Sequence, residues 1–344
     1  MIDLHPPVGI READRADHDR IDAFVRDQPG ATPFHLPAWS EAVALGCGQR
    51  ARYLIAEREN GGIAGVLPLT DVRSPLFGRA LVSTGFGVGG GILGDATEAL
   101  AAGAVDLARR IGTTSVELRG GAVPAGWARD DNSYLGFVKT LAADDEAELK
   151  AVPRKQRAEI RRAATLDLAV SIGRGERDLA DHYRVYAESV RNLGTPVFPR
   201  ALFRHVLATM DADILTVRSQ GVAIASVLSL YLDGTVYPYW GGGTAASRSL
   251  RAHEHLYFSL MRHARGRGCT RFDFGRSKTG TGAAAFKKNW GFTPELRQYA
   301  KRSTGPARDV NPLNPKYALM VRTWRRLPLP VANALGPWIA RGLG

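Results

Sequence analysis

The residues best suited to chemistry lie in one stretch, FDFGRSKTGTGAAAFKKNWGF, residues 272–292. Asp273 alternates with two phenylalanines in a strand pattern, which places its carboxylate on the face opposite their rings. It could act as a base or orienting group there, or it could cap the next turn or pair with Arg276. We expect Arg276 and Lys278 to lie on a glycine-rich loop over an anionic substrate. The helix that follows would then present Lys287.

Several other chemistries are not expected from the motifs. His253 and His255, in the string HEH, are two residues apart on a predicted helix and point to different sides, so the sequence predicts no metal site. No G-x-G-x-x-G follows a first strand and no G-x-x-x-x-G-K-[ST] occurs, which argues against a dinucleotide fold and a P-loop. The two cysteines, Cys47 and Cys269, are too few for a disulfide framework or a zinc site.

The bulk composition bounds the remaining classes. The 344 residues, 44% of them hydrophobic, are enough for two domains of ordinary size. No apolar run of about 20 residues and no signal-peptide pattern occurs, so we predict a cytoplasmic protein without a transmembrane segment. The net charge of +12 favours anionic partners such as nucleic acid, nucleotide phosphates or an acidic membrane face, without choosing among them.

The elements that must position these residues follow a duplicated plan. Each half contains an antiparallel hairpin, a glycine-rich strand end, a helix and a short strand. AGVLPL at 64–69 matches ASVLSL at 225–230, and the triple glycine at 89–91 matches the one at 241–243. This order predicts an α/β (α+β) fold of two tandem units, each a mixed sheet flanked by helices.

The predicted boundaries follow this plan. Residues 1–145 form the first unit, 146–165 a basic linker helix, 166–305 the second unit with the active site, and 306–344 a C-terminal extension. The basic run at 150–162 could bind tRNA phosphates or an anionic bilayer, or it could simply be solvated. The C-terminal sequence is too short and too broken by proline to span a bilayer, but Trp338, Ile339 and its leucines could rest on one.

The order of elements resembles tandem proteins of the GNAT acetyltransferase fold. The strings PRKQRAEIRRA, SVRNLGTPVFPRALF, PYWGGGT, FDFGRSKTGTGAAAFKKNWGF and NPLNPKYALMVRTWRRLPLPVANALGP together resemble the Fem-type (FemAB-like) acyl and aminoacyltransferases, in the branch associated with exopolysaccharide and PEP-CTERM surface-protein systems. The likeness is strongest from about residue 150 onward, and F-K-x-x-W-G-F after D-F-G is its most specific motif.

The resemblance implies a function. It is acyl or aminoacyl transfer to an amine or hydroxyl of a cell-envelope glycan or peptidoglycan precursor, at the inner face of the cytoplasmic membrane. The donor would be aminoacyl-tRNA or acyl-CoA, with no tightly bound cofactor. The acceptor would be a glycan or muropeptide precursor, which a lipid could carry. Peripheral membrane contact would suit such an acceptor.

The resemblance also implies roles for single residues. Lys287 matches the lysine of the family's F-K-x-x-F/W-G signature, where a cation could hold a phosphate or a developing oxyanion. Arg191 and Arg200 match the arginine region before the second-unit loop, although Arg191 also suits the negative end of a helix dipole. Arg248 could bind a phosphate in the turn TAASRS, where the usual Q/R-x-x-G-x-G/A pattern is missing, or that turn could be purely structural. Tyr239 and Trp240 could stack on a base or sugar, or pack in the core.

Three alternatives remain open. One is an acyl-CoA-dependent N- or O-acyltransferase of exopolysaccharide sugars. Another is a non-catalytic binding partner of a polysaccharide or surface-protein export system, which is favoured by the lack of a decisive acid–base pair. The third, non-specific nucleic-acid binding, rests on the charge alone.

Overall fold

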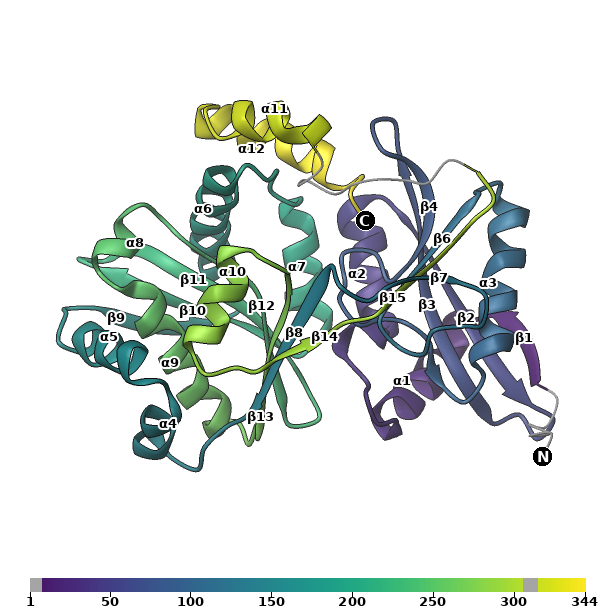
Figure 1. The fold of residues 1–344 in the computed structure, drawn as a ribbon, viewed down its shortest axis with the longest axis horizontal. Coiled ribbons are helices and arrows are strands. Elements are labelled where there is room, and N and C mark those ends of the chain that lie inside the picture. Colours follow the sequence, from purple (N-terminus) through teal and green to yellow (C-terminus); the bar gives the residue numbers. More distant parts are fainter. Residues whose placement is uncertain (1–7, 306–314) are drawn as a thin grey trace. The chain divides into compact units, whose positions relative to one another are not determined.

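The computed structural model describes residues 8–305 and 315–344, with side chains described from residue 318 in the second of these ranges. The described chain divides into two compact units. The first contains residues 8–131, 298–305 and 339–344, and the second contains residues 132–297 and 315–338. Each unit has one mixed sheet flanked by helices (Figure 1), so the predicted fold class is confirmed.

The first unit contains a sheet with the strand order β1-β2-β3-β4-β6-β15-β7, and β5 pairs with β3. Its strands are β1 (Val8–Glu12), β2 (Arg50–Arg58), β3 (Ile63–Ser74), β4 (Gly78–Ser83), β5 (Leu93–Gly94), β6 (Ser115–Arg119), β7 (Ala128–Asp130) and β15 (Tyr299–Ser303). Its helices are η1 (Arg15–Asp17), α1 (His18–Asp27), η2 (Pro33–His35), α2 (Pro37–Cys47) and α3 (Thr97–Ile111). Leu100, Ala104 and Leu107 form the buried stripe of α3, at the spacing of one helix face.

The second unit contains a sheet with the order β14-β8-β13-β12-β11-β10-β9. Its strands are β8 (Tyr134–Thr140), β9 (Ala169–Gly173), β10 (Ala212–Ser219), β11 (Val222–Leu232), β12 (Thr235–Gly243), β13 (Arg271–Lys278) and β14 (Pro294–Leu296). Its helices are α4 (Asp145–Ala151), α5 (Arg154–Ala164), α6 (Glu176–Leu193), α7 (Arg200–Thr209), α8 (Ala246–Ser249), α9 (Ala252–Gly266), α10 (Gly282–Asn289), α11 (Pro315–Trp324) and α12 (Leu329–Ala340), whose last residues group with the first unit. Its main core packs α5, α9 and α10 on the sheet.

The two sheets share one plan, and each is completed by a strand from the other half of the sequence. In the first unit β15 lies between β6 and β7, and in the second β8 lies between β13 and β14. The predicted boundaries at 145 and 305 are therefore wrong, because they assign β8 to the first unit and β15 to the second. Strand periodicity shows which residues face the core, but it does not show which sheet edge the strand will join.

The basic segment predicted as a linker also belongs to the second unit. Ile160 and Ala163 of α5 are buried, and α5 packs against α9. Glu159 of α5 pairs with Arg251, the residue before α9. Of the predicted C-terminal extension, residues 306–314 lie outside the described part of the chain, as do residues 1–7 of the predicted first unit.

The triple glycine of the second unit allows close packing. A Cβ atom built on Gly241 would lie 2.7 Å from the Tyr257 hydroxyl, and one on Gly242 would lie 2.7 Å from Cβ of Ser189. Helices on the sheet therefore approach β12 more closely than any side chain at these positions would permit. These glycines are explained by packing without a bound phosphate.

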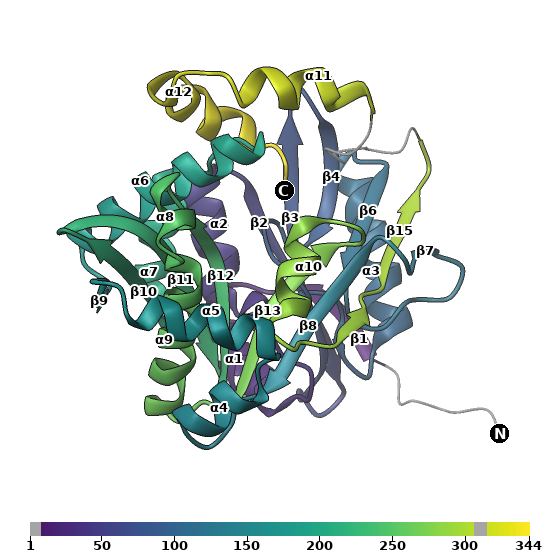
Figure 2. The same cartoon turned by 60° about the vertical axis from the view of Figure 1, so that its left-hand side comes forward.

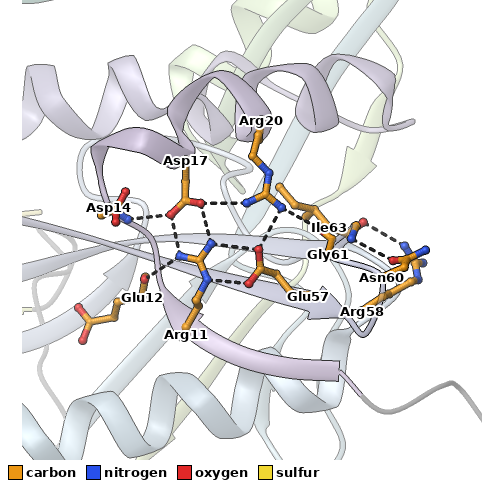
Figure 3. A network of polar contacts seen from close by, with 11 residues as sticks. Arg11, Glu12, Asp14, Asp17, Arg20, Glu57, Arg58, Asn60, Gly61 and Ile63 are labelled. Carbon is orange, nitrogen blue, oxygen red and sulfur yellow. Dashed lines mark hydrogen bonds and ion pairs between the residues drawn. The ribbon is translucent and has the colours of Figure 1, made fainter.

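A network of ion pairs ties β1, α1 and β2 together in the first unit (Figure 3). The Arg11 guanidinium donates to Asp17 at 2.6 and 2.7 Å and to Glu57 at 2.6 and 3.0 Å. Arg20 donates to the same two carboxylates at 3.2 and 3.0 Å. The hydrogen bond from Arg11 lowers the pKa of the Asp17 carboxyl to about 2, so this ion pair stabilises the fold.

Within residues 8–305 and 315–344, no helix has both the length and the apolar character needed to cross a membrane.

Candidate active site

The predicted stretch at 272–292 folds as a strand, a short turn and a helix. β13 pairs with β8 on one side, and its register shifts between Asp273 and Arg276, where the strand forms a bulge. Gly275 adopts a φ of +68° in this bulge, a conformation that side chains with a Cβ rarely take. The glycine of the D-F-G string is therefore required by the backbone, and the carbonyl oxygens of Gly275 and Arg276 at this bulge accept hydrogen bonds from a side chain.

Lys287 reaches these carbonyl groups from α10. Thr281 begins the helix by accepting a hydrogen bond from the Ala284 amide, at 3.4 Å. Ala284 and Lys287 are three residues apart and face the sheet, whereas Lys288 is exposed. Helix α10 packs on β13 (Figure 2).

The Lys287 amine lies in a largely apolar setting. Its Nζ donates to the carbonyl oxygens of Gly275 at 3.3 Å and Arg276 at 3.0 Å. It also lies 5.3 and 5.4 Å from the ring centroids of Phe137 and Phe274. Burial lowers the pKa of Lys287 to about 8 from 10.5, against the opposing attraction of Asp273.

Asp273 shares this site. Its Oδ1 accepts a hydrogen bond from the Gly275 amide at 2.8 Å, and Arg297 Nη2 lies 4.0 Å from its Oδ2. Burial raises the pKa of the Asp273 carboxyl, although Arg297, the Gly275 amide and Lys287 lower it. The carboxylate thus accepts a hydrogen bond from the backbone of the bulge and also interacts electrostatically with Lys287.

The site lies where two parallel strands separate. β12 and β13 pair in register at two positions only, Thr235 with Arg271 and Val236 with Phe272. The next residues are Tyr237 on β12 and Asp273 on β13, and the charge of Asp273 adds to the burial that raises the Tyr237 pKa. The separation leaves the β13 bulge unpaired on the side toward β12 in the described chain.

Two predicted cations on β13 occupy strand positions instead of a loop. Arg276 pairs with Gly136 of β8 in the ladder and Lys278 with Tyr134. The Arg276 guanidinium lies 4.5 Å from the Tyr134 ring centroid, and Lys278 Nζ lies 5.9 Å from it. The prediction of a loop was wrong because β8, a distant part of the sequence, extends the strand to Lys278.

The other predicted binding residues lie outside this cluster. Arg191 donates to the carbonyl oxygen of Arg325 at 3.3 Å, and Arg200 donates to Glu176 at 3.2 Å. Trp240 is buried with its ring 4.6 Å from that of Phe203, so it packs in the core. The remaining two are Tyr239, whose ring meets Trp240 edge to face at 4.9 Å, and the exposed Arg248 on α8.

Sequence reasoning missed three residues near the site. Arg297 follows β14, donates its amide to the Tyr134 carbonyl at 2.9 Å, and lies across Gly136. Tyr134 and Phe137 come from β8, which was assigned to the other unit. No local signal could have found them, because only the strand exchange brings them to β13.

The cluster has the parts that acyl transfer needs. Two of the three donors of a Lys287 ammonium are used by the bulge carbonyls, which leaves one for a substrate oxygen. Asp273 is a nearby proton acceptor with a raised pKa. Perturbed titratable groups of this kind gather at functional sites. No group of three or more candidate metal ligands occurs in the described residues.

Comparisons with known proteins concern the fold and one domain of the chain. Residues 151–288 match the family model of the acetyltransferase (GNAT) domain, which includes both Asp273 and Lys287. A crystal structure of FemX resembles the chain with a TM-score of 0.67 and 15% identity, covering 84% of this chain and 96% of that one. Curated proteins give no match.

Two further structures share the fold. The C-terminal domain of a putative lysylphosphatidylglycerol synthetase from Agrobacterium fabrum has a TM-score of 0.56 and 16% identity, covering 90% of this chain and 97% of that one. A tandem GNAT protein from the clavulanic acid biosynthesis pathway has a TM-score of 0.55 and 12% identity, with coverage of 88% and 100%. Residues 151–288 therefore match a GNAT acetyltransferase domain within the second unit, and the fold of the chain is similar to that of a tandem GNAT structure.

Proposed function

We propose that the chain transfers an acyl or aminoacyl group to an amine or hydroxyl acceptor at the centre formed by Lys287 and Asp273. One observation carries the proposal. A largely buried lysine with a lowered pKa lies beside a carboxylate with a raised pKa, at the point where β12 and β13 separate inside the matched GNAT domain. In this proposal Lys287 stabilises the oxyanion and Asp273 accepts the proton.

The reaction follows from these roles. The acceptor nitrogen or oxygen attacks the donor carbonyl carbon, forming the new amide or ester bond, and the donor's thioester or ester bond breaks. The Lys287 ammonium donates to the carbonyl oxygen as negative charge develops there. Asp273 takes the acceptor's proton, which passes to the departing thiolate or alkoxide.

The substrate class is proposed from chemistry and from the named neighbours. The name of the lysylphosphatidylglycerol synthetase refers to a lysyl group joined to a phospholipid, which supports an aminoacyl donor such as aminoacyl-tRNA. The clavulanic acid protein is named in relation to AcCoA, which supports acyl-CoA. The acceptor in our proposal is a glycan or muropeptide precursor of the cell envelope, modified at the inner face of the cytoplasmic membrane, as in exopolysaccharide systems. Arg276 and Lys278 would attract its phosphates.

Thermal unfolding with each donor separates the two classes. We expect the Tm to rise with acetyl-CoA or with charged tRNA, but not with both. A rise with acetyl-CoA alone assigns the acyl-CoA alternative, and a rise with charged tRNA alone assigns aminoacyl transfer. If neither donor, nor deacylated tRNA or CoA, changes the Tm, the transferase proposal fails and a non-catalytic binding role replaces it.

The lysine is tested by a matched pair of variants. Lys287→Met keeps the length of the side chain and removes its charge, and we expect it to lower kcat about 100-fold. Lys288→Met changes the exposed neighbour on the same helix and should leave kcat within about twofold. Equal activity of the two variants, with equal Tm values, would remove Lys287 from the mechanism.

A further inference from the structure

The C-terminal helices present apolar side chains away from the protein. Val331, Leu335 and Trp338 on α12 are 43%, 47% and 48% exposed, and their spacing of four and three residues places them on one face. The opposite face carries the small residues Ala332 and Gly336, both buried. The large apolar side chains therefore leave much of their surface exposed, and no residue of Leu329–Ala340 is charged.

Helix α11 also exposes apolar side chains, and other residues of it hold it to the protein. Leu319 is 65% exposed and Met320 49% exposed. Val321 instead meets Gly194 at the end of α6, where a Cβ atom would lie 2.6 Å from its Cγ1, and Arg325 donates to the Leu193 carbonyl at 3.3 Å. Figures 1 and 2 both show α11 and α12 side by side over this end of α6.

The segment that carries these apolar residues is also positively charged. From residue 318 to 344 the sequence carries four arginines and no lysine, aspartate or glutamate. Arg322, Arg325 and Arg326 are exposed on α11 and in the turn after it, and Arg341 follows α12 in the sequence. Exposed apolar groups on a segment whose charged side chains are all arginines match a phospholipid interface, where acyl chains receive the apolar groups and anionic headgroups receive the arginines.

We infer that Leu319, Met320, Val331, Leu335 and Trp338 form a membrane-docking surface of α11 and α12 for bilayers that contain anionic phospholipids. The tryptophan suits the headgroup boundary, where an amphipathic ring is favoured. A second copy of the chain fits less well. A two-fold contact through this surface would bring the arginines of both copies together without an acidic partner on either helix.

Co-sedimentation with vesicles tests the surface without any enzymatic substrate, so its result is independent of the proposed function. The full chain is mixed with vesicles of phosphatidylcholine alone, and with vesicles of equal parts phosphatidylcholine and phosphatidylglycerol. We expect about tenfold more protein to pellet with the anionic vesicles, and raised salt to weaken that binding. Binding that is equal for the two kinds of vesicle would overturn the anionic requirement.

Variants locate the surface. The double variant Leu335→Glu with Trp338→Glu should lower the bound fraction about tenfold, and Arg322→Glu with Arg326→Glu should lower it to a similar extent. Val222→Glu, which replaces a residue of β11 that is 56% exposed, is the matched control and should bind as the unmodified chain does. Unchanged Tm values establish that the variants are folded.

The alternative occupant has a distinct outcome. If the unmodified chain dimerises in analytical ultracentrifugation and the Leu335→Glu, Trp338→Glu variant is monomeric, the surface joins two copies and the membrane inference fails. The inference fails as well if the unmodified chain does not pellet with anionic vesicles, or if the apolar variant pellets equally well.

Discussion

Each unit contains one pair of neighbouring parallel strands, and the two units differ at this pair. In the first unit the parallel strands β4 and β6 pair at three positions. Beyond them, a bridge between Ile92 and Gly121 continues the pairing along this seam, the line where the two strands meet. Gly91 lies so close to Gly120 there that a Cβ atom would lie 1.8 Å from its carbonyl oxygen. In the second unit β12 and β13 pair at two positions and then separate. Backbone pairing therefore continues along the first seam and ends early along the second.

The carboxylates at the two seams differ in the same way. Glu117 on β6 accepts from Arg119 at 2.9 Å, and Lys301 of β15 lies 3.5 Å from it. Asp273, its counterpart on β13, has Arg297 no closer than 4.0 Å and a raised pKa. The pairing of Glu117 stabilises the first unit, whereas the second unit keeps a carboxylate and a lysine in settings that disfavour their charges. Such a cost in stability is expected where function requires it.

The largest expected effect concerns the first seam. Gly91→Ala should lower the free energy of unfolding by about 4 kcal/mol, because the new Cβ would meet the rigid backbone of Gly120. Gly241→Ala meets the movable Tyr257 hydroxyl and should cost about 2 kcal/mol. Gly266→Ala, with no atom near its Cβ position, is the control. Denaturant unfolding measures all three, and equal costs at Gly91 and Gly241 would contradict a rigid first seam.

The second prediction compares the two carboxylates. Asp273→Asn should lower kcat/KM about 100-fold, since an amide keeps the acceptor for the Gly275 amide but does not take a proton. Glu117→Gln should leave kcat/KM within about threefold and lower the Tm instead, because its ion pairs are lost. Steady-state kinetics with the identified donor measure the difference. A large kinetic loss in Glu117→Gln would place chemistry in the first unit.

The third prediction tests the stabilising role of the first unit's ion pairs. Asp17→Asn should cost about 2 kcal/mol at pH 7, since the pKa of this carboxyl is lowered from 3.8 to about 2 by Arg11. A lowered pKa contributes stability that is present above the ordinary value and is lost as the pH falls toward 2. The difference in free energy of unfolding between the unmodified protein and Asp17→Asn should therefore shrink below about pH 4.

Asp106→Asn is the control for this prediction, because its pair with Arg109 is exposed and should contribute at most about 0.5 kcal/mol. If Asp17→Asn and Asp106→Asn unfold at the same urea concentration, the network of Figure 3 contributes no more than a surface pair.

The smallest effect is the pH dependence caused by Lys287. Its pKa of about 8 lies below the ordinary 10.5, so above pH 8 the unfolded chain holds a proton that the folded chain has released. Stability relative to Lys287→Met should then rise with pH, by about 1 kcal/mol between pH 8 and 9. Urea unfolding of both proteins across this range measures it. If the difference in free energy of unfolding between the unmodified protein and Lys287→Met stays constant with pH, the Lys287 amine is not desolvated.

Part of this molecule could be predicted from local sequence. The antiparallel hairpin of each half is confirmed, and Gly61 in the β2–β3 turn and Asp233 and Gly234 in the β11–β12 turn adopt the positive φ that tight turns use. The strand at D-F-G and the helix that carries Lys287 are also confirmed as elements. The roles assigned to Lys287 and Asp273 remain predictions, and the exopolysaccharide branch does as well.

The rest was decided by contacts between distant residues. The strand exchange sets the unit boundaries, brings Tyr134 and Phe137 to β13, and makes strand residues of Arg276 and Lys278. Trp240 became a core residue because Phe203 packs on it, although a ring at a strand end fits stacking equally well. Local patterns do not contain this information, since an apolar or aromatic side chain has the same periodicity whichever partner it meets.

The sequence by itself determined the two-unit α/β plan, because hydrophobic periodicity and turn residues act over short distances. It also placed a lysine and a carboxylate within 15 residues of each other in FDFGRSKTGTGAAAFKKNWGF. Only the tertiary structure decided that their charges are disfavoured, since burial by β8, α10 and the bulge sets both pKa values. It also decided which side of α12 faces outward, because Gly336 packs closely against Val197 while Leu335 and Trp338 stay exposed.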